Sequence, residues 1–386
     1  MQRMTRILWL TAIESFATIL IERGVYFYTH GKLGFTDAEN LMLALGFGAA
    51  YVVGALASHG ASERLRERRM LLMVIGGQVL AHMVLCLRPT SAVVVVGTMV
   101  IGLLNGLKWP VIESYIGAGR TPSETVRSVG RFNLSWSAAV PLALVVAGPV
   151  IGWWAPGLFG LAAVLNVGGL ALAAGLARQP VHLPLDHPER ATPVERRRFG
   201  ALLVSSRWSM VASYSLMWVL AALMPEIFDR LGFAVVTATA MSGLLDVIRF
   251  ASFAALQTWR GWHNRAWPLA LVIVGMPLGF FMVLFGPDIA WVLAGELIFG
   301  ASAGMTYYAA LYYAMVVKDA SVVAGGGHEG IIGAGFAIGP AAGLLGRALE
   351  PMVGSLMLGR IIGLGTLVVV CAAGAIRALG RARRGG

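Results

Sequence analysis

Four ionisable side chains inside otherwise apolar stretches are the first candidates for chemistry in this sequence. Glu14, Thr18 and Glu22 recur at a spacing that places all three on one face of a helix. Lys108 and Glu296 lie in later apolar stretches. An ionisable group inside a bilayer costs about 2.5 kcal/mol or more, so it normally faces a cavity or pairs with an opposite charge. We expect the three carboxyl groups and the lysine to bind and release protons.

The depth of each charge within its stretch indicates its partners. Counted at about 1.5 Å per residue, Lys108 lies between Glu14 and Glu22 and can pair with either. Glu296 has no basic residue within one helical turn. A buried carboxyl group without a cation beside it is suited to exchange a proton. Glu22 and Glu296 are therefore the carboxyl groups to test first.

Four further residues are candidates for gating. Glu113 and Arg131 both lie about one and a half helical turns from the expected cytoplasmic surface. We expect an ion pair between them that closes the inner side of a cavity. Glu63 and Arg68 belong to an arginine-rich connection and are further candidates for gating.

Polar and aromatic side chains near these charges are candidates for contact with a solute. Asp246 and Arg249 lie three residues apart on one helical face, where they either face the solute or hold the fold together as a neutral pair. Trp109 and one or two tyrosines are expected to stack on an organic molecule. The candidate solute contacts are Arg23, Tyr26, Asn105, Trp109, Asp246, Arg249 and Tyr307.

The apolar stretches that carry these residues are long enough to cross a bilayer, which takes about 20 apolar residues. The composition agrees, with 58% hydrophobic residues, 13% charged residues and a mean hydropathy of +0.75. We predict an all-α polytopic membrane protein with about twelve transmembrane helices. The expected spans are 7–29, 39–59, 70–87, 92–116, 129–150, 156–177, 202–228, 234–256, 267–285, 289–316, 331–348 and 354–378.

Arginine in the short connections predicts the orientation, since loops rich in Lys and Arg stay in the cytoplasm. Clusters at 64–69, 196–198 and 377–384 fall on one side of the predicted topology, together with Arg3 and Arg6. Both termini are therefore expected to be cytoplasmic, in a plasma membrane or a bacterial inner membrane. This topology explains the net charge of +11 better than binding to nucleic acid does.

The sequence gives no sign of a metal, a cofactor or an enzyme site. Cys86 and Cys371 lie inside predicted spans, where a lone thiol behaves as a small apolar group. No Cys or His spacing resembles a metal site, and no G-x-x-x-x-G-K-[ST] loop for ATP occurs. A Gly-x-Ser-x-Gly nucleophile motif does not stand out either.

The longest polar interruption divides the chain near its midpoint. It contains four prolines among mixed charges, as expected of a linker on the cytoplasmic surface. The parts on either side echo each other, because Gly102 and Gly106 match Gly300 and Gly304 in offset. Such weak symmetry is typical of transporter repeats. We predict two pseudo-symmetric six-helix bundles, residues 1–177 and 202–386, joined by a linker over 178–201.

This organisation and the connection after the second span resemble the major facilitator superfamily. Residues 54–69 contain a glycine, small residues, an acid and a basic cluster, like the signature of that superfamily between its second and third helices. Ser58 or His59 stands where Asp is usual, and Glu63 comes late. The resemblance covers nearly the whole chain and implies two bundles that rock around a midplane site.

Three shorter motifs resemble the proton-coupled oligopeptide transporters. Residues 22–26, Glu-Arg-x-x-Tyr, are similar to part of the first-helix signature, with Ile19 in place of an earlier Glu. The Gly-x-Lys that ends at Lys108 and the Gly-Glu that ends at Glu296 are similar to motifs of the fourth and tenth helices. The resemblance implies that Glu22 and Lys108 handle the proton and that Glu296 meets a substrate amine.

Together these features predict a secondary active transporter, driven by protons, that acts as a monomer. The expected cargo is a small polar, zwitterionic or amphipathic organic solute, because acids and bases both occur at cavity depth. A multidrug-type or lipid exporter of the same fold is an alternative. A non-transporting membrane sensor or assembly factor is an alternative of another class, which would be expected to need an added soluble domain or a long tail.

Overall fold

The structure is a computed structural model that describes residues 2–117, 122–180, 193–318 and 322–384. Within these residues, twelve helices are long and apolar enough to cross a membrane, as the sequence predicts. A helix satisfies its own backbone hydrogen bonds, which is why apolar segments of this length adopt it in lipid. The protein is thus an all-α, multi-pass integral membrane protein.

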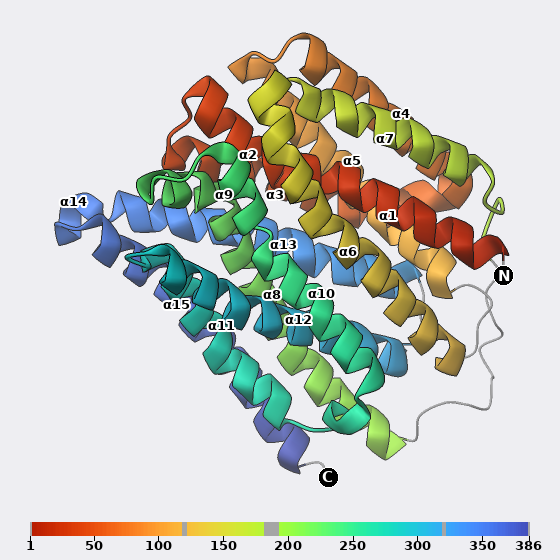
Figure 1. The fold of residues 1–386 in the computed structure, drawn as a ribbon. Coiled ribbons are helices and arrows are strands. Elements are labelled where there is room, and N and C mark those ends of the chain that lie inside the picture. Colours follow the sequence, from red (N-terminus) through yellow and green to blue (C-terminus); the bar gives the residue numbers. More distant parts are fainter. Residues whose placement is uncertain (1, 118–121, 181–192, 319–321, 385–386) are drawn as a thin grey trace.

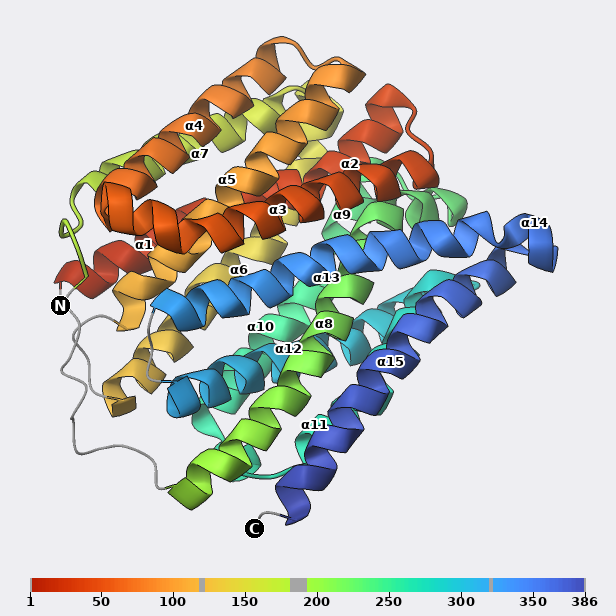
Figure 2. The same cartoon turned by 180° about the vertical axis from the view of Figure 1, so that it is seen from behind.

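The helices form two bundles of six spans each, and Figures 1 and 2 show these bundles from opposite sides. The first bundle contains α1 (Gln2–Glu22), α2 (Gly24–Tyr28), a π-helical turn (Thr29–Leu33), α3 (Asp37–Leu65), α4 (Glu67–Leu87), α5 (Ser91–Gly117), α6 (Pro122–Trp154) and α7 (Gly157–Ala174). The second contains α8 (Pro193–Arg230), α9 (Val235–Met241), α10 (Leu244–Thr258), a 3-10 turn (Arg260–Trp262), α11 (Trp267–Phe285), α12 (Ile289–Lys318), α13 (Val322–Ala348), α14 (Glu350–Val353) and α15 (Leu356–Arg384). Residues 181–192 of the predicted linker lie outside the described residues.

The two bundles approach each other at one end of the molecule and diverge toward the other. Figure 1 shows α2, α9 and α14 at the end where they approach, which we call the α14 end. Both chain termini lie toward the opposite end, which we call the terminal end. The interface between the bundles therefore has two structurally different ends.

Glycines allow the helices around this interface to approach closely. A Cβ atom on Gly106 of α5 would collide with the backbone oxygen of Tyr51 in α3. Across the bundles, a Cβ atom on Gly48 of α3 would collide with the backbone of Phe336 in α13. In a membrane, an apolar helix surface packs equally well against lipid and against another helix, so close packing must favour contact between helices. Small residues allow this close packing, because they let two backbones touch.

Two spans are interrupted, and each interruption places a charged residue. The first span breaks between α1 and α2 at Arg23, whose φ of -123° and ψ of -42° depart from helical values. The eighth span breaks between α9 and α10, and Asp246 lies in the first turn of α10. Irregular backbone at this depth is stable where protein, not lipid, surrounds it. Both breaks adjoin the centre of the interface.

Candidate functional site

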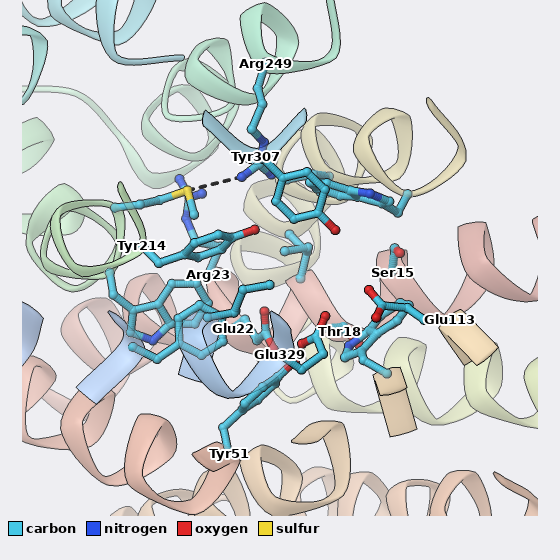
Figure 3. Close-up of a pocket in the computed structure, with 18 of the residues that line it drawn as sticks. Ser15, Thr18, Glu22, Arg23, Tyr51, Glu113, Tyr214, Arg249, Tyr307 and Glu329 are labelled. Carbon is cyan, nitrogen blue, oxygen red and sulfur yellow. Dashed lines mark hydrogen bonds between the residues drawn. The ribbon is translucent and has the colours of Figure 1, made fainter. Parts of the chain in front are cut away.

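A cavity lies between the two bundles. Its walls come from α1, α3, α5 and α6 on one side and from α8, α10, α12 and α13 on the other, and its volume is about 100 Å³. Figure 3 shows acidic, basic and tyrosine side chains that project into this space from both bundles. Its charged lining residues are Glu22, Arg23, Glu113, Arg249 and Glu329, and its large aromatic ones include Tyr51, Trp109, Trp136, Tyr214, Trp218, Tyr307 and Phe336.

Two arginines on this wall share one carboxylate. Arg23 Nη1 lies 3.1 Å from Asp246 Oδ2, and Arg249 Nη2 lies 2.8 Å from Asp246 Oδ1. The Arg249 guanidinium also lies 4.7 Å from the centre of the Trp136 ring. Because Asp246 stands in the first turn of α10, the helix dipole favours its negative charge. This ionic triad joins the break of the first span to the break of the eighth across the two bundles.

A second buried ion pair lies inside the first bundle, behind the cavity wall. Lys108 Nζ lies 2.7 Å from Glu14 Oε2, and neither side chain is exposed. The ammonium group also donates to Gln78 Oε1 at 3.0 Å and to Thr18 Oγ1 at 3.2 Å. Of the two partners that depth allowed for Lys108, the structure selects Glu14.

A chain of amide side chains connects this ion pair to the cavity. Gln78 donates to Asn105 Oδ1 at 2.6 Å, and Asn105 donates to Glu22 Oε1 at 3.1 Å. Glu22 itself lines the cavity. The sequence predicts Asn105 at the solute, whereas the structure places it between Gln78 and Glu22.

The same network extends away from the cavity through residues that the sequence analysis missed. Asn166 donates to Glu14 Oε2 at 3.0 Å, and His82 Nδ1 lies 2.8 Å from Asn166 Oδ1. His82 and Asn166 are each 1% exposed. Uncharged polar residues in apolar spans were the available signal, but they stand out less than charges do.

The gating pair expected between Glu113 and Arg131 is not formed. Arg131 is exposed on α6, whereas the Glu113 side chain is hydrogen-bonded to that of Glu329 on α13. The Tyr51 hydroxyl donates to Glu329 Oε2. Equal depth was the reason to pair Glu113 with Arg131, and depth does not say which helices face each other. Glu113 therefore contacts the opposite bundle and not α6.

The two other gating candidates, Glu63 and Arg68, lie on either side of the turn between α3 and α4. Glu63 Oε1 lies 3.4 Å from His59 Nε2 on the same helix, and both side chains are largely exposed. Arg68 donates to the carbonyl oxygen of Leu176 at 3.2 Å. The turn between α3 and α4 directs these two side chains to different neighbours.

The remaining candidates divide between the cavity and the protein interior. Trp109 and Tyr307 line the cavity, as expected of solute contacts. Tyr26 is 1% exposed and does not belong to the lining. Glu296 is fully buried within the second bundle, and neither carboxylate oxygen has a hydrogen-bond partner of good geometry among the described residues. Glu296 thus lies apart from the solute-facing surface.

Comparison with known proteins identifies the family. The sequence matches the profile of the Major Facilitator Superfamily over residues 10–344. The chain belongs to this superfamily. No curated protein matches the sequence, so more specific likeness comes from solved structures.

Several solved structures share this superfamily fold over nearly the whole chain. A mutant of the peptide transporter POT in complex with sulfate has 16% identity and a TM-score of 0.74, with 99% of this chain and 94% of that chain covered. A bacterial homologue of the human drug peptide transporters PepT1 and PepT2 has 15% identity and a TM-score of 0.71, with 100% and 99% covered. The human organic anion transporter MFSD10 (TETRAN) has 15% identity and a TM-score of 0.66, with 97% and 98% covered.

This superfamily member is a transporter and not an enzyme. Its cavity brings acidic and basic groups from both bundles within reach of one small molecule. Among the described residues, no group of three or more His, Cys, Asp or Glu side chains is arranged to hold a metal ion. The side chains that line the cavity can form ion pairs, hydrogen bonds and stacking contacts with a bound solute.

Proposed function

We propose that the protein is a proton-coupled secondary active transporter of a small zwitterionic or amphipathic organic solute. The observation that carries this proposal is the separation of opposite charges within one aromatic cavity. Arg23 and Arg249 offer guanidinium groups to a solute carboxylate. Glu113 and Glu329 offer acceptors to a solute amine, and the aromatic rings between them provide apolar contact area.

The side-chain network behind Glu22 supports coupling to protons. Glu22 faces the cavity and connects through Asn105 and Gln78 to the buried pair of Lys108 and Glu14. A solute or proton that arrives at Glu22 therefore changes the electrostatic environment of that pair. The likeness of fold to peptide transporters is compatible with a zwitterionic cargo.

We further propose which side of the membrane each end of the molecule faces. The arginine clusters at 64–69 and 377–384 belong to the terminal end. Loops rich in Arg stay in the cytoplasm, so we place both termini there. Residues 1–177 and 202–386 then act as the two moving halves of a monomer, joined by a cytoplasmic linker over 178–201.

Uptake into proteoliposomes tests the proposal. Wild-type protein is screened with dipeptides, amino acids and amphipathic cations, with and without a gradient that is acidic outside the vesicles. We expect gradient-driven uptake of a zwitterion that is lost in Glu22→Gln or Glu296→Gln. Glu63→Gln, which alters an exposed carboxyl group, is the matched control. Uptake that ignores the gradient and both substitutions would refute proton coupling, and flux of lipid or cations alone would refute the proposed cargo.

A further inference from the structure

The contact between Glu113 and Glu329 joins the two bundles through two acidic side chains. Glu113 lies on α5 of the first bundle, near its end at Gly117, and Glu329 lies on α13 of the second bundle, near its start at Val322. Both ends belong to the terminal end of the molecule. The two carboxyl groups are hydrogen-bonded to each other, and Figure 3 shows both at the cavity.

This bond has a fixed requirement for protons. An ionised carboxylate only accepts hydrogen bonds, whereas a protonated carboxyl group donates one. Two carboxyl groups can therefore bond to each other only when at least one of them carries a proton. Two ionised carboxylates at such a separation repel each other instead.

The surroundings of the pair do not supply a positive charge in place of the proton. Among the described residues, no basic side chain lies within ion-pair distance of Glu113 or Glu329, and the one further hydrogen bond to Glu329 comes from the Tyr51 hydroxyl. The two arginines of the cavity are engaged by Asp246. The titratable and charged groups that line the cavity with the pair are Glu22, Arg23, Tyr51, Tyr214, Arg249 and Tyr307. Beyond the lining, Lys108 is paired with Glu14, Arg131 is exposed on α6, and His328 next to Glu329 has Arg207 near it.

We propose that Glu113 and Glu329 bind one proton between them and that this shared proton holds the two bundles together at the terminal end of the cavity. The inference deepens the proposed function, on which it rests for the role of protons in transport. One proton is bound when the two carboxyl groups meet. The same proton is released to the solvent on that side when they separate, because two ionised groups no longer bond.

The location of this proton differs from that of the other candidate carboxyl groups. Glu14 and Glu22 belong to the first bundle alone, and Glu296 belongs to the second bundle alone. The Glu113–Glu329 pair exists only while the bundles are in contact. Binding of the proton and contact between α5 and α13 on the terminal side of the cavity are therefore one event.

A distance measurement on the purified full-length protein in lipid nanodiscs tests this inference. Spin labels are attached at Gly60→Cys and Thr258→Cys, exposed positions near the terminal ends of α3 and α10, after Cys86→Ala and Cys371→Ala. Double electron–electron resonance then reports the separation of the bundles from about pH 5 to about pH 9. We expect a short distance at low pH that gives way to a longer one as the pH rises.

Two substitutions should act in opposite directions, which a folding defect would not produce. In Glu113→Gln the amide donates an N–H to the remaining carboxylate, so the short distance should persist at every pH. In Glu329→Ala the bond is lost, so the longer distance should prevail at every pH. Glu63→Gln, the matched control, should follow the wild type. A wild-type pH response in both Glu113→Gln and Glu329→Ala would overturn the proposal.

The measurement uses neither solute nor gradient, so its outcome is separate from the uptake experiment. A pH-dependent distance without gradient-driven uptake would refute proton coupling of transport and retain the shared proton. Gradient-driven uptake with a distance that does not respond to pH would retain the proposed function and refute the shared proton.

Discussion

Lys108 and Glu14 form an ion pair, with 2.7 Å between Nζ and Oε2, that is sealed inside a single bundle. The pair is held by Gln78 and Asn166, which lie on α4 and α7 and hydrogen-bond to its two members. All of these partners belong to the first bundle. The same ion pair therefore stabilises the first bundle and is connected, through Gln78 and Asn105, to Glu22 at the cavity.

Removal of one member of this pair should destabilise the protein more than removal of both. Lys108→Met leaves Glu14 without its cation, which typically costs about 3–5 kcal/mol of stability for a buried pair. The double variant with Glu14→Leu removes both charges and should regain part of that loss. Thermal unfolding in detergent measures both variants. A double variant less stable than Lys108→Met would contradict this account.

The carboxylate of Asp246 should be needed for uptake. Asp246→Asn leaves Arg23 and Arg249 beside each other without the acceptor they share, so both guanidinium groups should leave their present positions at the cavity wall. We expect uptake to fall at least about tenfold, which corresponds to ~1.4 kcal/mol. Asp229→Asn, whose side chain is 77% exposed, provides the control. Equal uptake by the two variants would exclude the triad from solute binding.

The α14 end is closed by a different set of charges, which can be weakened selectively. Asp37 on α3 accepts from Arg347 at 2.5 Å and from Arg360 at 2.6 Å, both of the second bundle. Asp37→Asn should shift the population toward opening at this end by about tenfold, or ~1.4 kcal/mol. Spin-label distances across the α14 end measure the shift.

Glu226 supplies the comparison for Asp37. It lies 3.7 Å from Arg360 and its side chain is 41% exposed, so Glu226→Gln should have a smaller effect. If the two substitutions opened the α14 end equally, the contacts of Asp37 would not be what closes it.

Close approach of α3 and α5 should make Gly106 sensitive to a single methyl group. Gly106→Ala places a Cβ atom against the backbone oxygen of Tyr51, and overpacking of this kind costs about 1–3 kcal/mol. Gly168→Ala is the matched control, because a Cβ atom there meets nothing within 4 Å. It should be neutral or slightly stabilising. A melting temperature of Gly106→Ala equal to that of the control would show that the two helices can separate at no cost.

The spans were predictable because length and apolar composition are properties of one segment at a time. Depth along a span is also a one-dimensional quantity, and it correctly limited the partner of Lys108 to Glu14 or Glu22. It failed for Glu113, because Arg131 and Glu329 lie at similar depth on different helices. The choice between them depends on which helices face each other across the bundles, and that is decided by packing far along the chain.

Uncharged polar residues were the other part of the site that could not be predicted from the sequence. Gln78, His82 and Asn166 are each 1% exposed and extend the network around Glu14. Their transfer into lipid costs less than that of an ion, so a single such residue in a span is a weaker signal than a glutamate. Only the folded bundle shows that Asn166 donates to Glu14, that Gln78 accepts from Lys108, and that His82 lies against Asn166.

The shared carboxylate of Asp246 has an electrical consequence. With two guanidinium groups and one carboxylate, the triad carries one more positive than negative charge, and that charge lies deep in the membrane. Arg23 belongs to the first bundle, whereas Asp246 and Arg249 belong to the second. When the bundles move relative to each other, the positive charge of Arg23 moves within the transmembrane field, which acts on a unit charge with about 2.3 kcal/mol per 100 mV across the whole bilayer. We therefore expect membrane voltage to bias the end at which the protein opens.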